Sequence, residues 1–139
     1  MAIQLDCYLS FAGNCEEALN FYAQCLGGKA TLMRYDTAPK DSGMPVPQGW
    51  EKKVMHGTVE AQGAQIMASA VPPEMGGGGV FKGFSVSFWA KDGVDQARKV
   101  FEALSAGGKV TMPLDKPFWG GWVDMVGDKF GLPWKVGCE

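Results

Sequence analysis

Apolar residues recur with a helical period in two separate stretches of the chain. The apolar positions are Ala18, Phe21, Tyr22, Cys25 and Leu26 in the first stretch and Val94, Ala97, Val100, Phe101 and Leu104 in the second. Spacings of three and four residues place each set on one face of an α-helix. Asn14 and Asp92 stand at N-cap positions, and a Gly-Gly pair, which favours helix termination, follows each stretch. The pattern predicts two helices, each with one buried face.

The segment around each Gly-Gly pair is repeated. Leu-Gly-Gly-Lys-Ala-Thr at 26–31 returns as Ala-Gly-Gly-Lys-Val-Thr at 106–111, and such self-similarity indicates a duplicated unit. One strand is expected before each helix and three after it, at 3–11, 29–36, 54–60 and 64–70 in the first copy and at 84–90, 109–114, 122–126 and 133–138 in the second. The sequence therefore predicts an α+β fold of two βαβββ modules in one domain, 1–139. Module one covers about 1–71 and module two about 83–139, and the proline- and glycine-rich segment 71–82 links them.

Alternation along the first strand of each module assigns its two faces. The residues expected to face the helices are Leu9, Phe11, Val86, Phe88 and Ala90, and those expected to face away are Asp6, Tyr8, Ser10, Ser85, Ser87 and Trp89. A sheet with helices on one side and small polar residues on the other is typical of a sheet curled around a cavity. The serines leave room there for a small ligand.

Composition and charge narrow the class of protein. The chain has 139 residues, 46% of them apolar and 20% charged, with a net charge of −2, so a basic face for nucleic acid or an anionic membrane is not expected. No apolar run approaches the roughly 20 residues of a membrane span, and the N-terminus lacks signal-peptide features, which favours the cytoplasm. The four cysteines, at 7, 15, 25 and 138, match no zinc pattern and are expected to be reduced thiols.

Several local motifs add a resemblance that covers almost the whole chain. They are Phe-Ala-Gly-Asn-Cys-Glu-Glu-Ala at 11–18, Val-Met-His-Gly at 54–57, Gly-Phe-Ser-Val at 83–86, Lys-Pro-Phe-Trp at 116–119 and Asp-Lys-Phe-Gly-Leu-Pro-Trp at 128–134. With the duplicated module, they resemble the PhnB-like branch of the vicinal-oxygen-chelate superfamily, which includes glyoxalases, bleomycin-resistance proteins and dioxygenases. The resemblance implies a curled mixed sheet around a cavity, and a homodimer.

The same resemblance implies a divalent metal held by the first and last strands of each module. Counting along the strands places those four positions at Asp6, Met67, Ser85 and Lys135. Only Asp6 suits a hard divalent ion, because Met67 is a soft ligand, Ser85 a weak one and Lys135 a cation. We therefore expect no cofactor and no usual metal site. The predicted ligand-binding residues are Asp6, Tyr8, Ser10, Met67, Ser85, Ser87, Trp89, Trp119 and Lys135.

His56 is the single histidine of the chain and the candidate for acid–base chemistry. Aligning the hairpin glycines Gly63 and Gly131 pairs His56 with Asp124 of the second module. A histidine ordinarily titrates near neutrality and a carboxylate can orient it, so the two are the predicted catalytic pair. The alternative is that His56 only satisfies a backbone carbonyl. Cys15 is a weaker nucleophile candidate, because the first turn of a helix lowers a thiol pKa.

Two functions remain open at this stage. The first is a small-molecule-binding protein without the usual metal. The second is a metal-dependent lyase, isomerase or dioxygenase with an atypical site around Asp6 and His56. A methyltransferase that uses S-adenosylmethionine is not favoured, because it normally has a glycine-rich turn between a strand and a helix, which this chain lacks.

Overall fold

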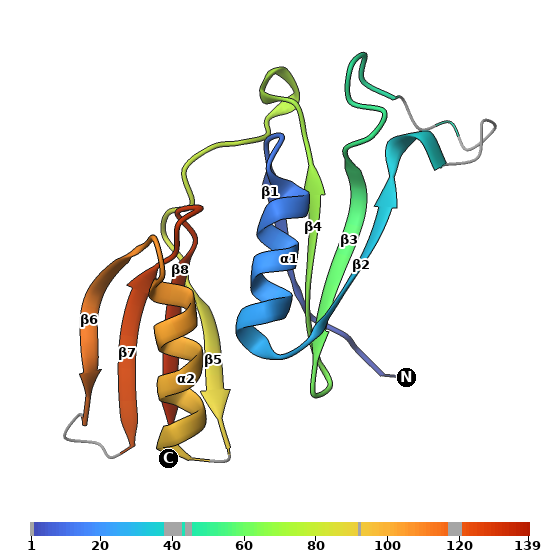
Figure 1. The fold of residues 1–139 in the computed structure, drawn as a ribbon. Helices are drawn as coiled ribbons and strands as arrows, with labels where there is room; N and C mark the ends of the chain where they lie inside the picture. The colour runs from blue at the N-terminus through green and yellow to red at the C-terminus, as the bar shows by residue number, and fades with distance from the viewer. Residues whose placement is uncertain (1, 38–42, 44–45, 92, 117–120) are drawn as a thin grey trace. The chain divides into compact units, whose positions relative to one another are not determined.

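The chain forms two compact units, Met1–Gly79 and Val80–Glu139, in a computed structural model (Figure 1). The structure describes residues 2–37, 43, 46–91, 93–116 and 121–139. Each unit contains one four-stranded sheet and one α-helix. No helix among these residues is long and apolar enough to cross a membrane.

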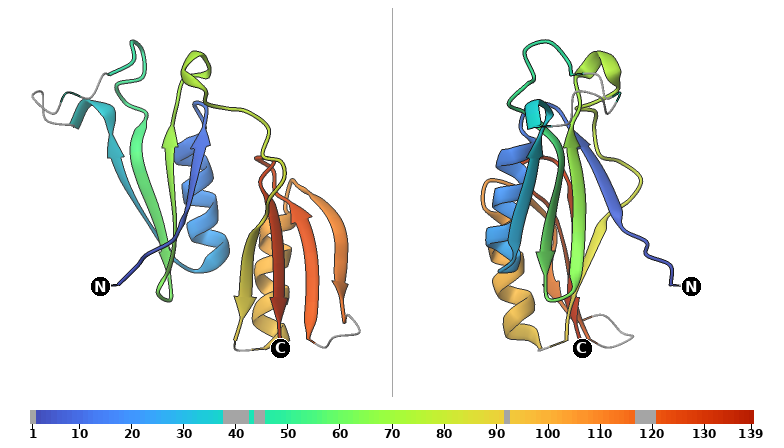
Figure 2. Two further views of the ribbon diagram at one scale, coloured as in Figure 1. Left: turned by 180° about the vertical axis from the view of Figure 1, so that it is seen from behind. Right: turned by 90° about the vertical axis from the view of Figure 1, so that its right-hand side faces the viewer.

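The first unit has the order predicted for one module. Its elements are β1 (Cys7–Phe11), α1 (Cys15–Leu26), β2 (Lys29–Arg34), the 3-10 helix η1 (Tyr35–Thr37), β3 (Val54–Ala61), β4 (Ala64–Ala70) and the 3-10 helix η2 (Pro73–Met75). The strands are arranged β1-β4-β3-β2. β1 runs parallel to β4, and the other two pairs are antiparallel. The helix covers one face of the sheet, as two further views show (Figure 2).

The second unit repeats this topology. Its elements are β5 (Val86–Ala90), α2 (Val94–Ser105), β6 (Lys109–Asp115), β7 (Trp122–Gly127) and β8 (Pro133–Cys138). The strand order is β5-β8-β7-β6, again with the first pair parallel. The predicted α+β fold of two βαβββ modules is therefore confirmed. The strands form two separate sheets and not one continuous curled sheet, since no strand pairing joins the two among the described residues.

Helix α1 packs closely on its sheet. Its buried residues are Cys15, Ala18, Leu19, Tyr22 and Cys25. Leu19 was not in the predicted stripe, but it lies against β3, where a Cβ added to Gly57 would overlap its side chain. The predicted termination at the Gly-Gly pair is confirmed: the helix ends at Leu26, and the C-cap residue Gly27 has a φ of 66°, the left-handed conformation that glycine adopts without steric cost.

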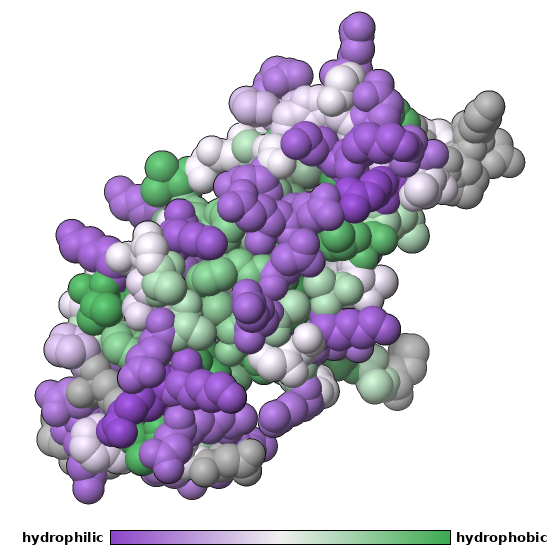
Figure 3. Space-filling view, viewed as in Figure 1, coloured by the Kyte–Doolittle hydropathy of each residue, from purple (hydrophilic) through white to green (hydrophobic). Residues whose placement is uncertain are grey.

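Helix α2 buries a narrower stripe, Ala97, Val100 and Leu104. The space-filling view shows hydrophilic surface over this helix (Figure 3), and Arg98 and Lys99 of the helix are exposed. Gly93 stands at the N-cap position, and Asp92, which was predicted there, lies outside the described residues. The narrow stripe matches the amphipathic pattern from which the helix was predicted.

The first strand of each unit begins later than predicted. Pairing of β1 with β4 starts at Cys7 and Ile66, close to the hairpin turn where β4 begins. The preceding Ile3 and Leu5 have no strand partner and are more than 90% exposed. In this register the first residue of β4, Ala64, is opposite Leu5, so Ile3 and Gln4 lie beyond the end of the neighbouring strand and their backbone groups lack ladder partners there. Asp6 and Ser85 lie just before β1 and β5.

Candidate functional site

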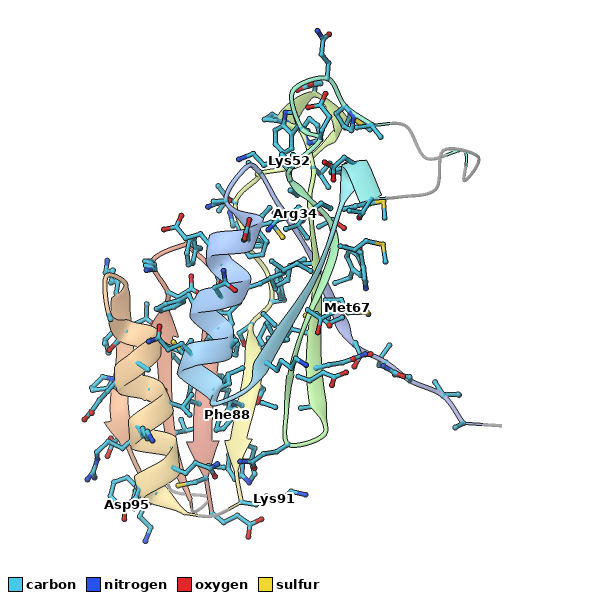
Figure 4. All side chains as sticks on the ribbon, turned by 45° about the vertical axis from the view of Figure 1, so that its right-hand side comes forward. Arg34, Lys52, Met67, Phe88, Lys91 and Asp95 are labelled. Carbon is cyan, nitrogen blue, oxygen red and sulfur yellow. The ribbon has the colours of Figure 1, made fainter. Side chains whose placement is uncertain are left out.

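The open face of the first sheet, opposite α1, carries a group of polar and soft side chains. Along β1, Leu9 is buried while its neighbours Tyr8 and Ser10 are exposed, so the predicted assignment of faces is correct for this strand. Met67 of β4 lies on the same side as Tyr8, away from α1 (Figure 4). The open face is thus partly exposed, polar and not covered by the helix of its own unit.

The strand register brings residues from four strands together on this face. Tyr8 of β1 pairs with Met67 of β4, Met67 pairs with Thr58 of β3, and His56 of β3 pairs with Met33 of β2. Tyr8 is 51% exposed and Met33 is 48% exposed. The imidazole of His56 is therefore flanked by an accessible phenol ring and an accessible thioether.

A chain of hydrogen bonds connects His56, Tyr8 and Ser69 to the backbone of β3. The Tyr8 hydroxyl lies 3.0 Å from His56 Nδ1 and 2.5 Å from Ser69 Oγ. The hydroxyl of Ser69 donates to the backbone carbonyl of Met55 at 2.8 Å. The rings of Tyr8 and His56 are also in contact, with centroids 5.6 Å apart. Tyr8 and Ser69 thus fix the position of the imidazole.

The Met55 carbonyl needs this side-chain donor because of a bulge. Met33 pairs with His56, whereas Arg34, the next residue of β2, pairs with Val54. Met55 is therefore the extra residue of a β-bulge and is left out of the β2–β3 ladder. A carbonyl without a ladder partner is satisfied by another donor, here the hydroxyl of Ser69.

Asp6 occupies a different part of the open face. Its carboxylate accepts hydrogen bonds from the side-chain amides of Gln65, at 2.8 Å, and Gln4. Gln65 and Ser69 are four residues apart on β4, which corresponds to about 13 Å along a strand. Asp6 therefore lies at one end of this face and His56 at the other.

The open face of the second sheet has different chemistry. Register pairs Ser87 of β5 with Lys135 of β8, and Trp89 with Gly137. The Trp89 ring lies directly over Gly137, where an added Cβ would be 2.6 Å from Cζ3 of the indole. Trp89 is 44% exposed as a residue. This face therefore presents an exposed indole, that of Trp89, next to Ser87 and Lys135.

The strand register shows which residues lie beside the four positions, Asp6, Met67, Ser85 and Lys135, at which the superfamily holds its metal. Met67 has Tyr8 as its β1 partner, and Lys135 has Ser87 as its β5 partner, two residues beyond Asp6 and Ser85. Neither pair suits a hard divalent ion, because a thioether and an ammonium group are poor ligands for it. Among the described residues there is no group of three or more His, Cys, Asp or Glu side chains that could hold a metal ion.

The alignment of His56 with Asp124 is off by one residue. In the two sheets Thr58 and Met125 are equivalent, since they pair with the equivalent Met67 and Lys135. The counterpart of Asp124 is therefore Gly57, on the helix-covered face. Between the equivalent pairs Glu60–Gln65 and Gly127–Pro133 the first hairpin has four residues and the second has five, and a one-residue difference moves residues counted across the loop to the other face.

Asp124 is a fully buried carboxyl group. It is 0% exposed, pairs with Val136, and neither of its oxygens has a hydrogen-bond partner among the described residues. Burial raises its pKa to about 7, and the nearby Val136 backbone N–H opposes that rise without reaching hydrogen-bonding geometry. His56 and Asp124 belong to different units, so their catalytic pairing stays a prediction.

The thiol of Cys15 does not have the properties of a nucleophile. It is completely buried beneath the first turn of α1. Burial, followed by the charge of Glu16, raises its pKa to about 12, the reverse of what its place at the helix start had indicated. None of the four cysteines, all of which are among the described residues, forms a disulfide.

The sequence reasoning missed Ser69, Thr58 and Gln65. Ser69 and Gln65 lie two residues on either side of Met67, so alternation along β4 was the signal that placed them on the open face. Trp119, one of the predicted ligand-binding residues, lies outside the described residues.

Comparisons with known proteins agree with this architecture. The chain is 32% identical over 139 residues to Protein YjdN of Escherichia coli (strain K12), an alignment that covers 95% of this chain and 92% of YjdN. The crystal structure of protein PA1353 from Pseudomonas aeruginosa has a TM-score of 0.85 and 34% identity, with coverage of 99% of this chain and 98% of that one.

A more distant structure has the same fold. The putative 3-demethylubiquinone-9 3-methyltransferase, PhnB protein, from Bacillus cereus has a TM-score of 0.74 and 22% identity, covering 99% of this chain and 100% of that one. The sequence model of the Glyoxalase/Bleomycin resistance protein/Dioxygenase superfamily matches residues 4–136. The duplicated module, its topology and these matches together show that the chain belongs to the glyoxalase/bleomycin resistance/dioxygenase superfamily.

Proposed function

We propose that this protein is a PhnB-like member of its superfamily that binds a small organic molecule on the open face of the first sheet, without a divalent metal at the superfamily positions. The observation that carries the proposal is the group formed by Tyr8, His56 and Met67. It combines an accessible aromatic ring and a thioether with a hydrogen-bonded imidazole. Apolar surface with a few fixed polar groups is the usual composition of a small-molecule site.

The alternative of a metal-dependent enzyme around Asp6 and His56 has less support. The Asp6 carboxylate accepts a hydrogen bond from Gln65, whereas the His56 imidazole is linked through Tyr8 to Ser69. Two groups that lie about 13 Å apart along the sheet cannot share one ion, since metal–ligand bonds are about 2 Å long. Neither Met67 nor Lys135 supplies the ligand that is lacking.

Binding can be tested by NMR with methyl-labelled methionine. Compounds from a library of soluble metabolites are expected to shift the Met67 methyl signal together with the His56 ring signals. Met67→Ala is expected to weaken the binding of such a compound about tenfold, the equivalent of one lost apolar contact. Met75→Ala is the matched control, because Met75 lies outside the sheet and is 57% exposed. Compounds that bind without moving the Met67 signal would contradict the proposal.

The metal status has its own test. Elemental analysis of protein purified without chelator is expected to find less than stoichiometric zinc, nickel, iron or manganese. One equivalent of any of these metals, lost on mutation of Asp6 or His56, would instead support the metal-dependent alternative.

Two further expectations belong to the same proposal. We propose a homodimer in the cytoplasm as the working form, on the strength of the superfamily resemblance. Sedimentation velocity at micromolar concentration tests the dimer, and a monomer there contradicts it.

A further inference from the structure

The hydrogen bonds around His56 fix where its proton lies. The carbonyl oxygen of Met55 can only accept, so the single proton of the Ser69 hydroxyl is used in the 2.8 Å contact between them. Ser69 must then accept from Tyr8, which uses the phenol proton as well. The Tyr8 oxygen can therefore only accept from His56, and Nδ1 of the imidazole must carry a proton.

Hydrogen bonds that ran in the opposite direction, from Ser69 to Tyr8 to His56, would leave two acceptors, the Ser69 oxygen and the Met55 carbonyl, facing each other. If Tyr8 donated to Nδ1, Ser69 would have to donate to Tyr8, and no proton would remain for the Met55 carbonyl. That carbonyl lies at the bulge, outside the β2–β3 ladder, and Ser69 is only 8% exposed. Met55 is partly buried, and a carbonyl there that loses its donor is costly. The bulge at Met55 therefore sets the direction of the whole chain.

With its proton on Nδ1, neutral His56 has an unprotonated Nε2. No hydrogen bond to Nε2 occurs within the part of the chain that the structure describes. Protonation at Nε2 leaves the Nδ1–H bond to Tyr8 unchanged, because an imidazolium donates from both nitrogens. The imidazole can thus accept a hydrogen bond or a proton at Nε2 without any rearrangement of its neighbours.

Among the described residues, the other charged side chains that the strand register places on this face lie near its far end. They are Asp6 before β1, Lys29 of β2 and Glu60 of β3, the last two of which pair with each other. The part of β4 on this face, Gln65, Met67 and Ser69, carries no charge. Beside the hydroxyls of Tyr8 and Ser69, the imidazole has the Tyr8 ring and the Met33 thioether as neighbours, and both residues are about half exposed.

We infer that Nε2 of His56 is the hydrogen-bond acceptor of the ligand site, and that the ligand has an aromatic or apolar body with an O–H or N–H group that donates to Nε2. The inference rests on the proposed function and adds the chemical class of the ligand to it. Tyr8 and Met33 offer contacts that suit an aromatic body. Ser69 acts as a positioning residue, through Tyr8.

The tautomer can be tested in the free protein, because His56 is the only histidine. Proton–nitrogen NMR of the full chain with ¹⁵N-labelled histidine, above the pH at which the ring becomes neutral, is expected to show a protonated Nδ1 and an unprotonated Nε2. Ser69→Ala frees the phenol proton to donate to Nδ1, so the proton is expected to move to Nε2. Ser69→Thr keeps a hydroxyl and is expected to restore the original form.

Ser105→Ala is the matched control for Ser69→Ala, because the Ser105 hydroxyl also donates to a backbone carbonyl, that of Glu102. It is expected to leave the His56 signals unchanged. An Nε2–H form in the unmodified protein would overturn the inference, whatever the variants do.

Phenol and anisole test the ligand class, since they share an aromatic ring and only phenol donates an O–H bond. Phenol is expected to shift the Nε2 signal and to bind about fivefold more tightly than anisole, the equivalent of one hydrogen bond. In Ser69→Ala this preference is expected to be lost. Phenol that leaves Nε2 unmoved overturns the donor requirement. The proposed function fails separately, if library compounds bind without moving the Met67 methyl signal.

Discussion

Replacing Asp124 by asparagine is expected to remove a pH-dependent loss of stability. The carboxyl group is fully buried and lacks hydrogen-bond partners among the described residues. Burial raises its pKa from 3.8 to about 7. At 1.36 kcal/mol per pH unit, this corresponds to about 4 kcal/mol of folding free energy.

The sign follows from proton linkage. Between pH 4 and pH 7 the folded chain holds a proton on Asp124 that the unfolded chain has lost, so stability falls as the pH rises. The stabilisation is fully present below the unfolded pKa and is lost as the pH rises through the folded pKa near 7. The asparagine side chain of the variant cannot ionise, so the stability of Asp124→Asn has no such contribution.

Urea denaturation at pH 4 and pH 8, followed by tryptophan fluorescence, measures the effect. The stability difference between Asp124→Asn and the unmodified protein is expected to change by about 4 kcal/mol in favour of the variant between these two pH values. The cost of burying the amide cancels, because it is the same at both. Glu102→Gln, on the exposed face of α2, is the control and is expected to show no such change. A change below about 1 kcal/mol for Asp124→Asn would refute the reasoning.

Three further variants or reagents test the fold around the sites. Asp128→Ala removes an acceptor of three hydrogen bonds, from two backbone N–H groups and the Trp134 indole, and is expected to cost about 3 to 5 kcal/mol in urea denaturation; an effect below about 1 kcal/mol contradicts this. Gly57→Ala places a methyl group against Leu19 and is expected to lower stability by about 1 to 3 kcal/mol, whereas a neutral effect means that α1 can move away. Iodoacetamide is expected to leave buried Cys15 unmodified in the folded protein while modifying the partly exposed thiol at position 7, as peptide mass spectrometry can show; rapid labelling of Cys15 would contradict its burial.

Local patterns were sufficient to predict the elements and the faces of the first strands. Glycine at 27 and the three- and four-residue spacing of apolar residues determine where α1 ends and which side it buries. Alternation around Leu9 correctly placed Tyr8 on the open face. These features depend on residues close together in the chain, and for that reason the sequence alone was enough.

The alignment of His56 with Asp124, made by counting residues across the two hairpin loops, was wrong for a physical reason. The pairing of His56 with Asp124 assumed hairpins of equal length, and the odd difference between the two loops places Asp124 on the helix-covered face. The predicted first strand also began too early, because Ile3 and Gln4 lie beyond the end of the partner strand β4, which the residues of the first strand alone do not reveal.

The sequence by itself determined that this protein is a duplicated α+β domain with a single histidine on a strand of its first module. Only the tertiary structure decided what surrounds that histidine. Tyr8 is 48 residues from His56 and 61 from Ser69 in the chain, and the parallel register of β1 with β4 brings the three together. The direction of their hydrogen bonds depends on one carbonyl that a bulge leaves outside the ladder. Strand register and bulges arise from the packing of whole strands, so the direction of these hydrogen bonds cannot be read from local sequence patterns.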